Sequence, residues 1–155
     1  MKAILVAVGL VVGLVIGITL GAIAMHFLYS PIFGETPMNF QTIYFPNINR
    51  KIYTVARVWG ITGDHEEVRL CSEPYEFGKR DQTDQCVVFH TERIFYKKDG
   101  ASGLIVFAPS FSISPTNKEM IGPIKISTKS LKNFEEINDY EQNFENYGLM
   151  TIAAP

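Results

Sequence analysis

The segment 86-CVVFHTERIFYKKDGASGLIVFA-108 decides the fold, because it contains the clearest strand and turn signals of the chain. Cys86–Lys97 is rich in β-branched and aromatic residues, which favour strands. Asp99-Gly100 is a strong signal for a tight turn between two strands. Ser102–Ala108 then continues with an apolar run. The segment therefore predicts an antiparallel hairpin.

A second hairpin is predicted upstream, where side chains alternate between two faces. Gly60–His65 supplies a turn, and Glu66–Cys71 returns as the second strand. A further short strand is predicted over Phe40–Phe45. The two alternating sets of the first strand are Ile52, Thr54, Ala56 and Val58 on one face and Tyr53, Val55, Arg57 and Trp59 on the other.

Toward the C-terminus the apolar period changes from two to that of a helix. Asn133 is a suitable N-cap, Glu136 completes a pair resembling a capping box, and Gly148 lies where a left-handed helix end is expected. The predicted amphipathic helix has an aromatic stripe formed by Phe134, Ile137, Tyr140, Phe144 and Tyr147.

Other segments complete an α+β domain. Ile121–Thr128 is predicted as a strand, at an edge because of Pro123, and Leu149–Ala153 as a last strand. Pro109–Met120 is either a loop or an irregular strand. The expected fold is a small antiparallel β-sheet domain with one C-terminal amphipathic helix, preceded by a single N-terminal transmembrane helix.

The two cysteines, Cys71 and Cys86, are separated by fourteen residues. We expect them to form a disulfide, which would stabilise the fold by about 3 kcal/mol in the chain-entropy model. Two free buried thiols are the alternative. The enclosed loop carries Tyr75, Phe77 and Arg80, residue types that anchor protein interfaces, and it is the candidate partner-binding loop. The alternative is a surface loop that the disulfide closes and whose Tyr75 and Phe77 pack beneath it.

The N-terminal run Ala3–Tyr29 contains no Asp, Glu, Lys or Arg. A bilayer core of roughly 30 Å requires about 20 apolar residues as helix, so the run predicts a transmembrane anchor over 1–29. A juxtamembrane linker over 30–49 and an extracytoplasmic domain over 50–155 would follow. The alternative is a cleaved signal peptide, for which Ala22-Ile23-Ala24 offers a small-residue site.

Charge predicts the orientation of this anchor. Lys2 precedes the run, whereas Ser30–Asn49 contains no Lys or Arg, so the N-terminus is expected in the cytoplasm. A disulfide agrees with an oxidising compartment outside it. The chain lacks an Asn-x-Ser/Thr sequon, which favours a bacterial inner-membrane protein facing the periplasm.

Four glycines recur at four-residue spacing within the run: Gly9, Gly13, Gly17 and Gly21. Their spacing aligns them on one helix face, where a second helix could approach closely. This glycine zipper is similar to the small-xxx-small interfaces of glycophorin-type dimers, and the resemblance covers the helix alone. It implies self-association or packing against a partner transmembrane helix. A mixed apolar helix is the alternative.

No catalytic, metal or cofactor motif is recognisable, and the formal net charge of −2 gives no electrostatic argument for nucleic acid. His65 and His90 lack a metal-ligand spacing. We therefore expect a membrane-anchored envelope protein whose outer domain binds an extracytoplasmic protein, as an accessory subunit or an immunity-type inhibitor. The alternatives are a small membrane-tethered hydrolase with a site built from dispersed residues and a structural spacer.

Overall fold

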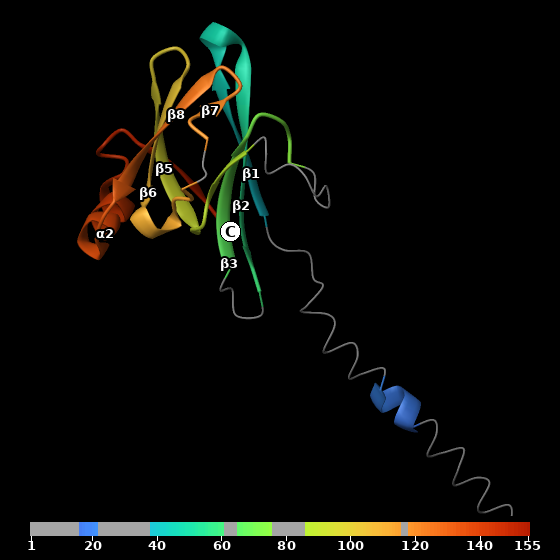
Figure 1. Ribbon diagram of the computed structural model, residues 1–155. Coiled ribbons are helices and arrows are strands. Elements are labelled where there is room, and N and C mark those ends of the chain that lie inside the picture. Colours follow the sequence, from blue (N-terminus) through green and yellow to red (C-terminus); the bar gives the residue numbers. More distant parts are fainter. Residues whose placement is uncertain (1–15, 22–37, 61–64, 76–85, 116–117) are drawn as a thin grey trace, which may run out of the picture. The chain divides into compact units, whose positions relative to one another are not determined.

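A computed structural model describes residues 16–21, 38–60, 65–75, 86–115 and 118–155 of the chain. Two compact units divide the chain, Met1–Glu35 and Thr36–Pro155. The second unit is a small sheet-rich α+β domain with one described α-helix, α2 (Figure 1). The predicted fold class is confirmed at this level.

The first sheet has four antiparallel strands in the order β1-β2-β3-β4. The hairpin predicted over 52–71 is confirmed by β2 and β3. The predicted strand over 40–45 is also present as β1, and it pairs with β2 along its whole length, so it belongs to the globular unit. The strands are β1 (Met38–Phe45), β2 (Arg50–Trp59), β3 (His65–Cys71) and β4 (Cys86–Phe89).

The second sheet has five strands in the order β7-β8-β6-β5-β9. The turn at Asp99-Gly100 is confirmed, because β5 and β6 pair antiparallel around it. Glycine is required at position 103 after this turn, since an added Cβ would collide with the carbonyl oxygen of Asp99. The strands are β5 (Arg93–Asp99), β6 (Gly103–Pro109), β7 (Met120–Ile121), β8 (Ile124–Leu131) and β9 (Met150–Ala153).

Three details of the predicted sheet are wrong. The strand expected over 86–97 is broken after Phe89, where the chain leaves the first sheet and enters the second. In addition, β6 and β8 pair in parallel, so the second sheet is mixed. The strand expected over 121–128 begins only at Ile124, as β8, and it lies between β7 and β6 and not at an edge, because Pro123 is in the turn between β7 and β8.

The segment 109–120, predicted as either a loop or an irregular strand, has features of both. It contains a 3-10 turn over Ser110–Ser112, followed by a single antiparallel bridge from Ile113 to Phe89. This bridge joins the segment to the first sheet.

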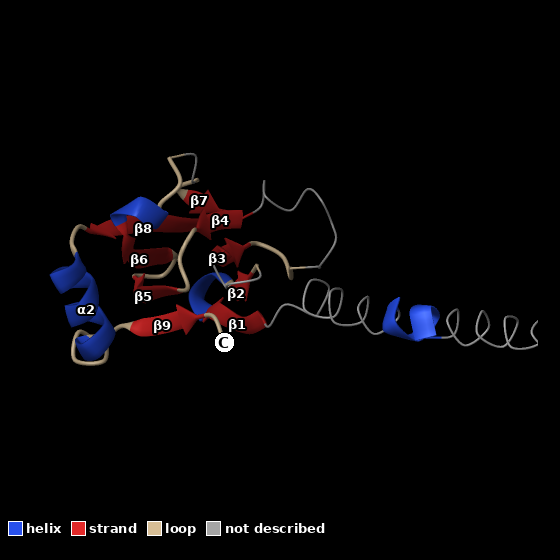
Figure 2. Cartoon of the chain, turned by 90° about the horizontal axis from the view of Figure 1, so that it is seen from below, coloured by secondary structure: helices blue, strands red, loops and turns tan. Residues whose placement is uncertain are grey.

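The two sheets pack face to face, and α2 lies on the outer side of the second sheet (Figure 2). Alternate side chains of both sheets fill the space between them, as expected for a sandwich. This main core contains fully buried residues from both sheets: Phe45, Ile52, Leu70, Val87 and Phe89 from the first, and Ile94, Leu104, Val106, Ile124 and Ile152 from the second.

Helix α2 (Phe134–Asn143) begins as predicted. The backbone N–H of Glu136 donates to the Asn133 side chain at 2.8 Å, and the Glu136 carboxylate accepts from the Lys132 N–H at 2.7 Å. Gly148 has a φ of 66°, in the left-handed region expected for it. Two such bonds at the N-terminus fix where the helix starts.

The apolar face of α2 forms a second core with the outer face of β5 and β6. Tyr140 packs on Phe107, with ring centroids 5.4 Å apart, and Phe144 packs on Phe95 at 5.6 Å. Phe134 departs from the predicted stripe, because 80% of it is exposed. It is the first helical residue and does not belong to the core that Ile137, Tyr140 and Phe144 form with the sheet.

Most of the run that predicts the membrane anchor lies outside the described residues. Residues 16–21 are α-helical, and Ile16, Ile18 and Leu20 expose more than half of their surface. The predicted transmembrane helix is not found, since none of the helices described is long and apolar enough to cross a bilayer.

Candidate functional site

The disulfide predicted between Cys71 and Cys86 is present, with an S–S distance of 2.04 Å. Cys71 ends β3 and Cys86 begins β4, and the two residues lie directly opposite each other in the antiparallel register. The bond therefore ties the two strands where they separate into the loop between them. It also fixes the position at which residues 72–75 leave the sheet.

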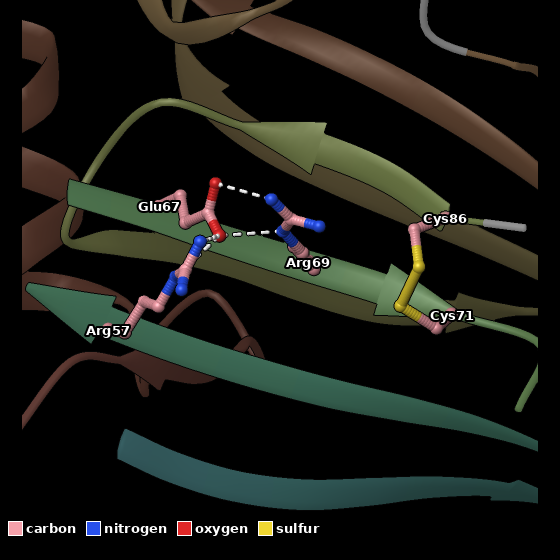
Figure 3. A network of polar contacts seen from close by, with 5 residues as sticks. All are labelled: Arg57, Glu67, Arg69, Cys71 and Cys86. Carbon is pink, nitrogen blue, oxygen red and sulfur yellow. Dashed lines mark hydrogen bonds and ion pairs between the residues drawn. A yellow bond between two sulfur atoms is a disulfide. The ribbon is translucent and has the colours of Figure 1, made fainter. Parts of the chain in front are cut away.

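Beside the disulfide, three charged side chains meet on the outer face of the first sheet (Figure 3). Arg57 on β2 lies directly opposite Glu67 on β3, and Arg69 follows Glu67 on the same face of that strand. The Nε atoms of both arginines donate to Oε1 of Glu67 at 2.6 Å. A further bond joins Arg69 to Oε2 at 3.1 Å.

These charges are largely removed from water. The Glu67 side chain is 4% exposed, and those of Arg57 and Arg69 are 15% and 14% exposed. An ionised carboxylate is retained at such burial only when partners satisfy its oxygens, and the two guanidinium groups do so here. Because two positive charges share one negative charge, these three residues carry a net charge of +1.

Aromatic rings enclose the arginines. The Arg57 guanidinium lies 4.3 Å from the ring centroid of Trp59, and that of Arg69 lies 5.4 Å from the ring of Tyr75. His65 stacks on Trp59 with centroids 5.5 Å apart. We call Arg57, Trp59, Glu67, Arg69 and Tyr75 the Arg–aromatic cluster.

The cluster includes one of the three residues predicted for the partner-binding loop. Tyr75 lies over both arginines, at 5.4 Å from Arg69 and 6.0 Å from Arg57. Phe77 and Arg80 lie outside the described residues. Tyr75 therefore connects the predicted partner-binding loop to the two arginines of the first sheet.

The charged members of the cluster were not predicted as site residues, although the sequence contained a signal for them. Once the hairpin over 52–71 is recognised, strand alternation places Glu67 and Arg69 on one face of β3, and the register places Arg57 beside them. The decisive information is therefore the pairing of two strands and not a local motif.

The two histidines of the domain lie in different places. His65 begins β3 beside the cluster, whereas His90 follows β4 and is exposed. Across the part of the chain that the structure describes, no three His, Cys, Asp or Glu side chains are grouped so that they could hold a metal ion.

Comparisons of the chain with protein-family models, with curated proteins and with solved structures gave no match. The geometry of the outer face of the first sheet is accordingly the basis for the functional argument.

Proposed function

We propose that this chain is a single-pass membrane-anchored protein whose outer domain binds another protein through the Arg–aromatic cluster. The observation that carries the proposal is the pair of arginines, held by one buried carboxylate and enclosed by Trp59 and Tyr75. Trp, Tyr and Arg are the residue types enriched at the energetic centres of protein interfaces.

Preorganisation supports this assignment. A free arginine loses considerable side-chain entropy when a partner immobilises it, whereas Arg57 and Arg69 are already held in place by Glu67. Their net positive charge favours a partner that presents a carboxylate-rich surface. The disulfide fixes the start of the segment that carries Tyr75, which reduces the cost of ordering that ring.

The membrane anchor is supported by the uncharged run Ala3–Tyr29 and by the helical form of residues 16–21. Ile16 and Leu20 lie on one face of this helix and Ile18 lies on the opposite face. All three are exposed, as expected for side chains that face lipid. In the proposed topology the N-terminus is cytoplasmic and the domain is extracytoplasmic, at a bacterial inner membrane. Confinement there raises the effective concentration near a membrane partner.

The glycine zipper is proposed to pack against a second copy or a partner helix. Gly17 and Gly21 lie in the described helical turn, where an added Cβ would meet nothing within 4 Å. Gly9 and Gly13 lie outside the described residues. An accessory subunit of an envelope complex and an immunity-type inhibitor are the two forms of the proposal.

The test is site-specific photocrosslinking in the native membrane with the full chain. A benzophenone side chain replaces Tyr75 in one variant and Phe134 in the matched control, which is 80% exposed on α2. We expect a discrete protein adduct from position 75 and none of the same mass from position 134. The adduct should weaken when Trp59→Ser is added. Absence of an adduct at 75, or equal adducts at both positions, would contradict the proposal.

A further inference from the structure

The terminal strand of the first sheet differs from the other edge strands. β1 is eight residues long, whereas β4 and β9 have four residues each and β7 has two. Proteins commonly protect an edge with a very short strand, a charge, a proline or a bulge. The sequence of β1, MNFQTIYF, contains no charge and no proline, and its register with β2 is unbroken from Met38 to Phe45.

Such an edge is suited to accept another strand. The backbone groups of β1 that point away from β2 face no strand of the first sheet. One of its carbonyl oxygens, that of Tyr44, accepts from Lys98 Nζ at 2.8 Å. A carbonyl has two lone pairs, so this contact leaves the oxygen able to accept a second hydrogen bond.

The side chains on the outward face of β1 are also available for pairing. Alternation places Phe40, Thr42 and Tyr44 outward, and Ile43 and Phe45 in the core. Phe40 is 59% exposed and Tyr44 is 44% exposed. Large exposed aromatic residues on an edge that no described strand pairs with are typical of an interaction surface.

We infer that β1 pairs antiparallel with β1 of a second copy of this chain, joining two four-stranded sheets into one sheet of eight. The residues of β1 carry no charge, so the strand can lie against its own copy without like-charge repulsion between its side chains, and Lys98 contacts it only near one end, at Tyr44. This inference does not depend on the proposed partner or on the membrane anchor.

Two-fold symmetry limits the possible registers between the two copies of β1. A two-fold axis perpendicular to the sheet keeps the outward faces of both copies on one side, so residues opposite each other must have the same parity. A pairing centred on Thr42 places Thr42 against Thr42 of the partner copy and Phe40 against Tyr44 of the partner copy. Thr–Thr and aromatic–aromatic pairs are among the favourable cross-strand pairs.

The register is tested by disulfide crosslinking of the full chain in detergent, with single cysteines at exposed positions. In a Thr42→Cys dimer the two Cβ atoms lie about 5 Å apart, whereas copies of Tyr44→Cys are offset by four residues, about 14 Å. We expect Thr42→Cys to crosslink and Phe40→Cys and Tyr44→Cys to do so only when mixed with each other. Similar yields at all three sites, as in a dimer held by the helices alone, would overturn the inference.

A charge swap provides the second test. Thr42→Lys places two positive charges opposite each other and should weaken dimerisation about fivefold, measured by analytical ultracentrifugation. Mixing Thr42→Lys with Thr42→Glu copies should restore the dimer. Formation of the Cys71–Cys86 disulfide reports that each variant has folded. Unchanged dimerisation of Thr42→Lys, or a mixture that remains monomeric, would show that β1 is not the interface.

Discussion

The outer faces of the two sheets are covered in opposite ways. On the second sheet, α2 covers Phe95 and Phe107 with Tyr140 and Phe144, so this face is an apolar core. On the first sheet, a carboxylate and two arginines are packed under aromatic rings. Both arrangements exclude water, but only the second retains polar groups that another molecule can contact.

This difference indicates what each face contributes. Apolar burial stabilises a fold in proportion to the area removed from water, without requiring a specific partner. A buried ion pair contributes little net stability, because desolvation of its charges offsets their attraction. The helix-covered face therefore has a structural role, whereas the proposed recognition role belongs to the Arg–aromatic cluster.

The largest expected effect tests the apolar face. Phe107→Ala should lower the free energy of unfolding by about 4 kcal/mol, because the ring is 5% exposed and its removal leaves a cavity under Tyr140. Urea denaturation measures the change. Phe134→Ala is the matched control on α2 and should change stability by less than about 0.5 kcal/mol. Comparable losses in both variants would mean that α2 does not cover the sheet as described.

A smaller loss is expected on the charged face. Glu67→Gln removes the negative charge that both arginines share and should lower the free energy of unfolding by about 3 kcal/mol. Glu141→Gln, on the exposed face of α2, is the control for loss of a carboxylate. Urea denaturation of both variants at neutral pH supplies the comparison.

Replacing all three charged residues of the Arg–aromatic cluster by apolar residues tests whether the loss in Glu67→Gln comes from unpaired buried charge. Arg57→Met, Glu67→Leu and Arg69→Met together should restore most of the stability that Glu67→Gln loses, because no charge then remains buried. The same triple variant should lose the crosslinked adduct at position 75. Retention of that adduct would remove the arginines from the proposed recognition surface.

The parts of the fold that depend on local signals could be predicted from the sequence. Asp99-Gly100 marks its turn, and Asn133 and Gly148 mark the helix region, because each acts on neighbouring backbone groups. The change of sheet after Phe89 could not be predicted in this way. It is held in part by the Glu92 N–H donating to Glu66 Oε2 at 3.1 Å, a contact across 26 residues.

The candidate site likewise combines features with a local sequence signal and features that depend on strand pairing. The disulfide was predictable, since two cysteines are visible in the sequence, and the structure places Tyr75, a member of the predicted partner-binding loop, beside Arg69. The burial of Glu67 was not predictable, because a Glu-rich stretch is usually solvated. One of its two arginine partners, Arg69, is close in sequence, but the other, Arg57, is supplied only by the register of β2 with β3. Parallel pairing of β6 with β8 is likewise a long-range feature without a local signal.

The smallest expected effect concerns the end of the helix-covered face. The hydroxyl of Tyr147 donates to Asp139 Oδ2 at 2.7 Å, and this bond is the main cause that raises the pKa of Tyr147 above 10.0. A raised pKa in the folded state means that the contribution to stability is fully present below pH 10 and is lost as the pH rises through the folded pKa. Burial also raises the pKa of Tyr96, in the main core.

Comparison of the parent chain with Tyr147→Phe isolates the contribution of Tyr147 to the pH dependence of stability, because both proteins retain Tyr96. The unfolding midpoint in urea, measured from pH 8 to 12, should fall more steeply above pH 10 in the parent chain than in Tyr147→Phe. Below pH 9 the two proteins should differ by a constant amount, since neither tyrosine ionises there. Parallel curves across the whole range would mean that the bond to Asp139 does not survive in solution, and would limit the stable part of the helix-covered face to Phe107, Tyr140 and Phe144.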